Sequence, residues 1–160
     1  MCPHCGTTLT AGKLTPEPSG ELVCRCIACQ AIIQDVGTTL RYYSGIALLD
    51  SSAIISGCVS KDLQRKGLFG GFTFLLHPLV ERETETPGGQ KERAILADFA
   101  AMDRIGWRSV EGRPVEVASD AHDDEIIEAA RSFSALLVTW DKGMYGKAVA
   151  RRVFCLTFRT

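Results

Sequence analysis

Two aspartates follow directly after apolar runs, where a buried strand gains nothing from a charged side chain. Asp50 ends the run GIALLD, and Asp141 ends the run SALLVTWD. An aspartate in such a place either caps a following helix or points at something that requires negative charge. If the two runs form neighbouring strands, their carboxylates lie side by side, which is costly unless a cation joins them.

A glutamate shares the apolar face of a third segment, PLVERETE. This segment begins with a proline, which favours the first turn of a helix. Glu83 comes three residues after Val80 and four after Leu79, so it lies on the face that these side chains turn towards the sheet. Glu81 and Glu85 do not share that face. Taken alone, Glu83 is also consistent with an ordinary solvated helix acid.

The stretch HDDEIIEAA offers a fourth acid. Asp123 precedes Ile126 and Ile127 by three and four residues and therefore points inward, whereas Asp124 points more to the side. Asp123 or Asp120 can instead be the N-cap of this helix, which is a common use of aspartate. The sequence alone leaves both uses open.

Together the four acids predict a site for divalent cations. A buried cluster of unpaired negative charge is prohibitively costly, and carboxylate oxygens are ligands that suit Mg²⁺ and Mn²⁺. We therefore expect one or two of these ions to be held by Asp50, Glu83, Asp123 and Asp141.

The cysteines predict a second, structural metal site. Five of the seven cysteines lie within the first 29 residues, and the stretches CPHC and CIAC are both C-x-x-C turns. Two such turns supply the four thiolates of a structural Zn²⁺ site, here Cys2, Cys5, Cys26 and Cys29, with Cys24 as the substitute for Cys26. Because so short a segment cannot build its own core, the metal replaces one. We predict a zinc ribbon over residues 1–40, and its contact with RNA stays open.

The composition is that of a globular protein, with 46% hydrophobic and 23% charged residues. The net charge is −1, so a polyanion would have to be held by local basic patches or by metal ions. No apolar run approaches the roughly 20 residues of a membrane helix, and the N-terminus lacks the pattern of an export signal. We therefore expect a cytoplasmic protein without membrane contact.

Strand-like and helix-like segments alternate after the ribbon. Continuous apolar runs predict strands and amphipathic stretches predict helices. The strands are expected at 45–50, 71–77, 113–119, 134–141 and 152–158, and the helices at 51–67 with a break near Gly57, 78–85, 90–106, 123–133 and 142–152. This alternation indicates a parallel sheet covered on both faces, whose working crevice lies at the carboxyl ends of the strands.

The segments ALLDSSAIISG, LLHPLVERETE, HDDEIIEAA and ALLVTWDKGM, in this order, resemble the four acid-bearing motifs of PIN-domain nucleases, the PilT N-terminus or VapC-like family. The resemblance covers nearly all of residues 45–160. It implies a three-layer α/β/α sandwich with a central parallel sheet, preceded here by the zinc ribbon. It also implies that the metal-binding acids are Asp50, Glu83, Asp123 and Asp141, with Asp124 as an additional acid and Thr139 as part of a Thr-x-Asp motif.

Aromatic and basic residues near the expected mouth of the site are candidates to hold RNA. Trp140 stands inside the Thr-x-Asp motif, where the family more usually has a small polar residue. Trp140 and Tyr145 can stack an unpaired base, although packing in the core is the alternative for Trp140. Phosphates can be held by basic side chains that are otherwise solvated surface charges, namely Lys61, Arg65, Lys66, Lys142 and Lys147.

We predict a metal-dependent endoribonuclease. Metal-bound hydroxide would attack a phosphodiester bond of RNA in line and leave 5′-phosphate and 3′-hydroxyl ends. The alternative is a catalytically inactive PIN-fold protein that binds RNA or serves as a scaffold, and a DNA nuclease is a third hypothesis. Besides the RNA substrate, the expected partner is an antitoxin or a ribosomal RNA precursor particle, and the resemblance also implies a homodimer.

Overall fold

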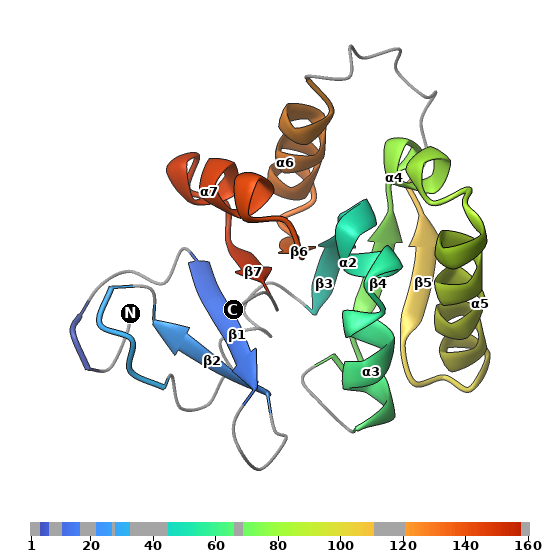
Figure 1. The fold of residues 1–160 in the computed structure, drawn as a ribbon, viewed down its shortest axis with the longest axis horizontal. Coiled ribbons are helices and arrows are strands. Elements are labelled where there is room, and N and C mark those ends of the chain that lie inside the picture. Colours follow the sequence, from blue (N-terminus) through green and yellow to red (C-terminus); the bar gives the residue numbers. More distant parts are fainter. Residues whose placement is uncertain are drawn as a thin grey trace.

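The computed structural model has, within the residues that it describes, a seven-stranded sheet at its centre (Figure 1). The described residues are 4–6, 11–16, 22–26, 28–32, 45–65, 69–110 and 121–157. In chain order the strands are β1 (Ala11–Pro16), β2 (Leu22–Cys26), β3 (Ile46–Leu49), β4 (Thr73–Leu76), β5 (Gly106–Ser109), β6 (Leu136–Thr139) and β7 (Cys155–Thr157). Their order across the sheet is β2-β1-β7-β6-β3-β4-β5.

The five strands from β7 to β5 run parallel. The strand β3 lies between β6 and β4, and its residues Ala47 to Leu49 are fully buried. Leu49 is paired with Val138 of β6, so the two strands leave the sheet at the same edge. Asp50 and Asp141 therefore start from neighbouring strands, which meets the condition under which their carboxylates would lie side by side.

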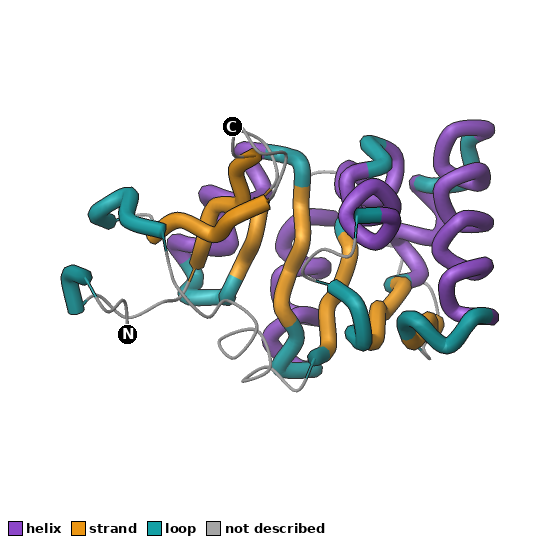
Figure 2. Tube along the Cα trace, turned by 90° about the horizontal axis from the view of Figure 1, so that it is seen from below, coloured by secondary structure: helices purple, strands orange, loops and turns teal. Residues whose placement is uncertain are grey.

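Helices flank this parallel sheet (Figure 2). They are α2 (Ser51–Ile55), α3 (Cys58–Gln64), α4 (Pro78–Glu83), α5 (Pro87–Ala101), α6 (His122–Ser132) and α7 (Lys142–Ala150). In the described part of the chain, none of them combines the length and the apolar character that a membrane crossing requires. The predicted break near Gly57 is confirmed, because this residue separates α2 from α3 with a left-handed φ of 73°.

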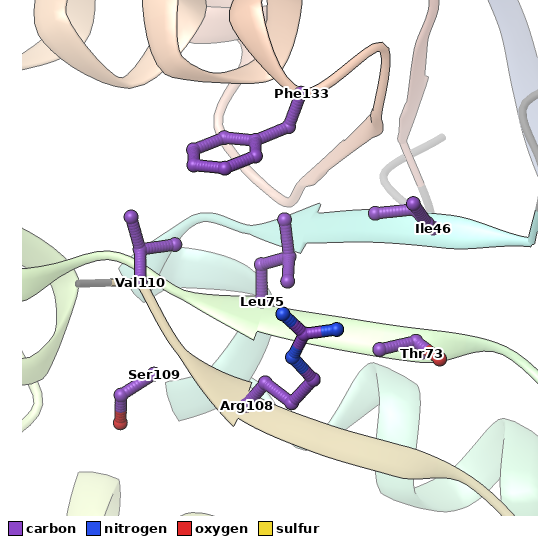
Figure 3. A pocket seen from close by; sticks show the side chains of 7 residues that line it. All are labelled: Ile46, Thr73, Leu75, Arg108, Ser109, Val110 and Phe133. Atoms are coloured by element: carbon purple, nitrogen blue, oxygen red, sulfur yellow. The ribbon is translucent and has the colours of Figure 1, made fainter.

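The helices form two layers, one on each face of the sheet. The chain moves across the sheet in one direction from β3 to β5 and in the other from β5 to β7, and right-handed crossovers place the helices of the two halves on opposite faces. Two neighbouring residues of β5 illustrate this. Trp107 lies against residues of α5, whereas Arg108 lines a cavity of about 630 Å³ bounded by Phe133, just after α6 (Figure 3). The predicted α/β/α sandwich is therefore confirmed.

The strand β5 corrects one prediction. The helix expected over 90–106 ends at Ala101, and the chain then turns through Asp103, whose φ is 57°, before β5 begins at Gly106. The sequence GWRS is short and mixed in polarity, so it carries no recognisable strand pattern. The strand expected at 113–119 lies outside the described residues.

The N-terminal hairpin continues the sheet. The strand β1 is antiparallel to β2 and parallel to β7, with Ala11 opposite Cys155 and Lys13 opposite Thr157. Thr157 is in turn opposite Thr139 of β6. The hairpin is thus joined through β7 to the strand that precedes Asp141. The division into a ribbon at 1–40 and a nuclease domain at 45–160 falls between residues 33 and 44, outside the described residues, and stays a prediction.

Two adjacent glycines in the first turn of α5 provide a matched test of the corner between α4 and α5. A Cβ at Gly89 would collide with the backbone of Thr84, whereas a Cβ at Gly88 would meet nothing within 4 Å. We expect Gly89→Ala to lower the free energy of unfolding by about 1–3 kcal/mol. Gly88→Ala should leave it unchanged or raise it by up to about 1 kcal/mol. Urea unfolding measures both, and equal stabilities would contradict this packing.

Candidate functional site

Asp50 is held where β3 ends and α2 begins. Its N–H donates to the carbonyl of Val138 in β6 (2.9 Å). Its Oδ1 accepts a hydrogen bond from the N–H of Ser51 (2.8 Å), so it caps α2. The residue is buried, with 7% of its surface exposed. Helix capping thus accounts for the contact of Oδ1, whereas the contacts of Oδ2 have another origin.

The second oxygen of Asp50 accepts two hydroxyl groups. Ser52 Oγ and Thr139 Oγ1 each donate to Asp50 Oδ2 over 2.8 Å. The N–H of Trp140 donates to Ser52 Oγ (3.0 Å). The N–H of Asp141 donates to Thr139 Oγ1 (3.0 Å). Each hydroxyl therefore links one backbone N–H of the turn after β6 to the same carboxylate oxygen, which fixes the orientation of the Asp50 side chain.

Glu83 approaches Asp50 through the hydroxyl of Ser51. Ser51 Oγ donates to Glu83 Oε2 over 3.0 Å and lies 3.4 Å from Asp50 Oδ1. Glu83 is the last residue of α4 and is exposed. Its other oxygen, Oε1, lies 3.6 Å from His122 Nδ1. The structure thus brings two of the predicted acids together, with one hydroxyl group between them.

Burial raises the pKa of the Asp50 carboxyl above its ordinary value, because a buried carboxylate loses its hydration. The hydrogen bonds from Thr139, Ser52 and Ser51 act in the opposite direction, and the charge of Glu83 raises the pKa further. Among the described residues, no lysine or arginine forms an ion pair with Asp50 or Glu83. The pair therefore favours a cation from solution, and a proton competes with that cation as the pH falls through the raised pKa.

Asp123 has a partner of its own. Its Oδ2 lies 3.1 Å from Lys147 Nζ in α7, and its side chain is partly exposed rather than fully turned inward. Asp123 lies within the first turn of α6, and the N-cap position is held by Ala121, which makes no side-chain capping bond. The capping alternative for Asp123 is therefore wrong, and Asp120 lies outside the described residues.

Asp141 and Asp124 also make separate contacts. Asp141 Oδ1 accepts the N–H of Gly143 (2.9 Å) and caps α7. Asp124 Oδ1 lies 2.7 Å from the guanidinium of Arg151. In the part of the chain that the structure describes, no three of the predicted acids have carboxylate oxygens within 4.8 Å of one another. The complete ligand set for Mg²⁺ or Mn²⁺ stays a prediction.

Three of the predicted zinc ligands gather beside the N-terminal hairpin. The Sγ atoms of Cys5, Cys26 and Cys29 lie within 4.8 Å of one another, and those of Cys5 and Cys26 are 3.8 Å apart. Cys26, the last residue of β2, is buried, whereas the other two are exposed. Within the described ranges this is the one group of three or more metal-ligating side chains at such distances.

The backbone around Cys26 forms the tight turn that a C-x-x-C pair requires. The N–H of Gln30 donates to the carbonyl of Cys26, and the N–H of Cys26 donates to the carbonyl of Ala31, both over 2.9 Å. Three thiolates at these distances suit a tetrahedral Zn²⁺ site. Cys2 and the side chain of Cys24 lie outside the described residues, so the fourth ligand stays a prediction.

The hydroxyl groups of Ser51 and Ser52 belong to the acid site, and the sequence analysis missed them. Serine is ordinary at the start of a helix, and only the tertiary positions of Glu83 and Thr139 give these two serines a further use. Their place directly after a strand-end aspartate, in ALLDSS, was the available signal.

Trp140 does not pack in the core. It is 37% exposed, whereas the preceding Thr139 is fully buried. Tyr145 is partly buried and packs against the core. The cavity of Figure 3 lies elsewhere, and none of the predicted site residues lines it.

No family model matches the chain, and no curated protein matches it in sequence. Among solved structures, it is similar to a domain of a functionally unknown protein from Methanocaldococcus jannaschii, with a TM-score of 0.65 and 19% identity over 72% of this chain and 91% of that one. It is also similar to a PilT N-terminus domain protein from Sulfolobus solfataricus, with a TM-score of 0.44 and 22% identity over 69% and 84%. The first similarity shows a shared fold and leaves function to be argued from the residues.

The cysteine cluster predicts which variant loses metal. Cys26→Ala removes the buried member, so we expect it to lose a Zn²⁺ that is otherwise bound at about one per chain. Cys24→Ala should retain the metal. The matched control is Cys58→Ala, which removes a distant buried thiol whose pKa burial raises to about 11. Elemental analysis of the purified variants decides, and zinc lost from Cys24→Ala but kept in Cys26→Ala would contradict the assignment.

Proposed function

We propose that the protein is a Mg²⁺- or Mn²⁺-dependent endoribonuclease whose centre is the Asp50–Glu83 pair. The observation that carries this proposal is the pair itself, which Ser51 bridges and which no lysine or arginine neutralises among the described residues. The pair lies at the carboxyl edge of a parallel sheet, where ligands of such folds bind. The resemblance of the four acid segments to PIN-domain motifs supports the same activity.

The donor atoms of the pair suit a hard divalent cation. Asp50 Oδ2 already accepts two hydroxyl groups, whereas Oδ1 accepts one N–H, that of Ser51, and keeps a lone pair for a metal on the side of Ser51 and Glu83. Glu83 is exposed and directs Oε2 at the same hydroxyl. Mg²⁺ is commonly held by one or two carboxylates and several waters, so Asp50 and Glu83 can supply the first protein ligands of such a site.

Asp123 and Asp141 are proposed to complete the ligand set after a change of partners. Asp123 would have to leave Lys147, with which it forms an exposed ion pair. Exposed ion pairs contribute only about 0–1 kcal/mol to stability, so a divalent cation can displace Lys147 from Asp123. Asp141 would bind through the oxygen that does not accept the N–H of Gly143.

The side chains of this protein position the acids and the RNA. When bound, a divalent cation supplies a water of lowered pKa and offsets the charge that develops on the phosphate. Ser52 and Thr139 hold Asp50 in one orientation, and Lys142, which is exposed beside Asp141, attracts phosphates. Water adds to phosphorus, the bond from phosphorus to O3′ breaks, and the departing oxygen takes up a proton. The products carry 5′-phosphate and 3′-hydroxyl ends.

A catalytically inactive protein that binds RNA or serves as a scaffold is the second candidate. The ion pair of Lys147 with Asp123 favours it, because it neutralises one of the four acids without a metal. If the chain is an active nuclease, a toxin held by an antitoxin and a processing enzyme of ribosomal RNA precursors are the two roles that we propose.

Replacing Asp50 separates the two candidates. We expect Asp50→Asn to reduce Mn²⁺-dependent cleavage of single-stranded RNA by about a hundredfold or more, since even changes to groups behind metal ligands cost about 10- to 100-fold. Asp98→Asn, which changes an exposed acid of α5, is the matched control and should cleave normally. Gel assays with and without EDTA measure the rates, and phosphatase sensitivity of the 3′ products identifies the new 5′-phosphate.

Thermal unfolding in EDTA checks that both variants are folded. Cleavage by Asp50→Asn at the rate of the unchanged protein would remove Asp50 from the site. RNA binding without any cleavage, in Mg²⁺ and in Mn²⁺, would favour the inactive RNA-binding protein.

A further inference from the structure

Trp140 is a partly exposed aromatic residue whose backbone N–H bonds to Ser52 of the acid site. The residue is 37% exposed although Val138 and Thr139, which precede it, are fully buried. It follows β6 directly and so leaves the sheet at the edge where Asp50 lies. Exposed apolar surface is unfavourable in water. Neither packing in the core nor the proposed hydrolysis accounts for the exposed part of Trp140.

The backbone that carries the indole is fixed to the acid site. The N–H of Trp140 donates to Ser52 Oγ over 3.0 Å, and Ser52 Oγ donates to Asp50 Oδ2 over 2.8 Å. The next residue, Asp141, is held at both its N–H, by Thr139, and its carboxylate, by the N–H of Gly143. Two hydrogen bonds thus separate the backbone of Trp140 from the Asp50 carboxylate. A turn whose backbone is held in this way loses little backbone freedom when its aromatic residue binds a ligand.

The surroundings of Trp140 favour a nucleobase over a protein surface. The residues that follow it, Asp141 and Lys142, are charged and exposed, whereas the aromatic anchors of protein interfaces are ringed by contacts that exclude water. Lys142 makes no ion pair within the described ranges. A stacked base needs a π face and a nearby cation for its phosphate, and this turn provides both.

We propose that Trp140 is a stacking platform for one unpaired nucleobase, in the nucleotide next to the phosphodiester bond at the Asp50–Glu83 pair. The position of that bond rests on the proposed function, whereas the stacking itself does not. A base within a duplex is covered on both faces by its neighbours, so this platform selects single-stranded RNA over double-stranded RNA.

Fluorescence of Trp140 tests the contact directly. The chain has two tryptophans, and Trp107→Phe leaves Trp140 as the only one. Trp107 lies on β5, which β3 and β4 separate from β6. A short single-stranded RNA, added in EDTA or in Ca²⁺, should quench the emission of this variant to saturation. The same strand annealed to its complement should quench it less.

Binding of a labelled single-stranded RNA, measured by fluorescence anisotropy, tests the energetic contribution. We expect Trp140→Leu to weaken binding roughly tenfold, within the range measured for base stacking. Trp140→Phe should retain most of the affinity, because it keeps an aromatic face. Phe133→Leu is the matched control, since it changes another exposed aromatic residue at the cavity of Figure 3 and should bind normally.

The absence of quenching at saturating RNA would overturn the proposal, and so would Trp140→Leu with the affinity of the unchanged protein. A variant Trp140→Leu that loses self-association but binds RNA normally would assign the ring to a protein contact and also overturn it. Quenching and weakened binding without any hydrolysis would leave the stacking in place and refute the nuclease. RNA hydrolysis by the unchanged protein, together with unchanged RNA binding by Trp140→Leu, would support the nuclease and refute the stacking.

Discussion

Two carboxylates that repel each other lie within reach of a single hydroxyl group, and the acid site is built around this contact. Asp50 is buried at the end of a central strand and Glu83 stands at the end of a helix on one face of the sheet, with Ser51 between them. Burial raises the pKa of Asp50, which means that the charged form is held at a cost. Because no lysine or arginine in the described part of the chain pairs with Asp50 or Glu83, the site is suited to a cation from solution.

The sheet holds this contact in place from both sides. Ser52 and Thr139, on α2 and β6, donate to the same oxygen of Asp50, so the order of strands β6 and β3 decides where that oxygen points. The N-terminal hairpin extends the support, because β1 pairs with β7 and β7 pairs with β6. Cys26, the buried member of the cysteine cluster, ends β2 and therefore belongs to one continuous sheet with the acid site, so metal bound at the cluster would stabilise that edge.

The elements and the strand-end acids could be predicted because they depend on local patterns. Continuous apolar runs marked the strands before Asp50 and Asp141. Helical spacing predicted that Glu83 faces the sheet, whereas its side chain is exposed and reaches Asp50 through Ser51. The contacts between elements could not be predicted, since no local pattern shows that Lys147, on a later helix, reaches Asp123. The strand β5 was missed because its four residues lack an apolar run. Packing of Trp140 in the core was a reasonable alternative from the sequence, because an apolar residue that follows a buried strand usually extends the buried segment. Only the structure shows that this residue is exposed.

A crystal of the protein soaked in Mn²⁺, measured at a wavelength where manganese scatters anomalously, tests the cation site most directly. An anomalous peak should lie between Asp50 and Glu83, within about 2.0–2.5 Å of an oxygen atom of each. An ordered crystal saturated with Mn²⁺ that shows no peak at this pair, or a peak only at Asp123 and Asp124, would contradict a metal centre built on Asp50.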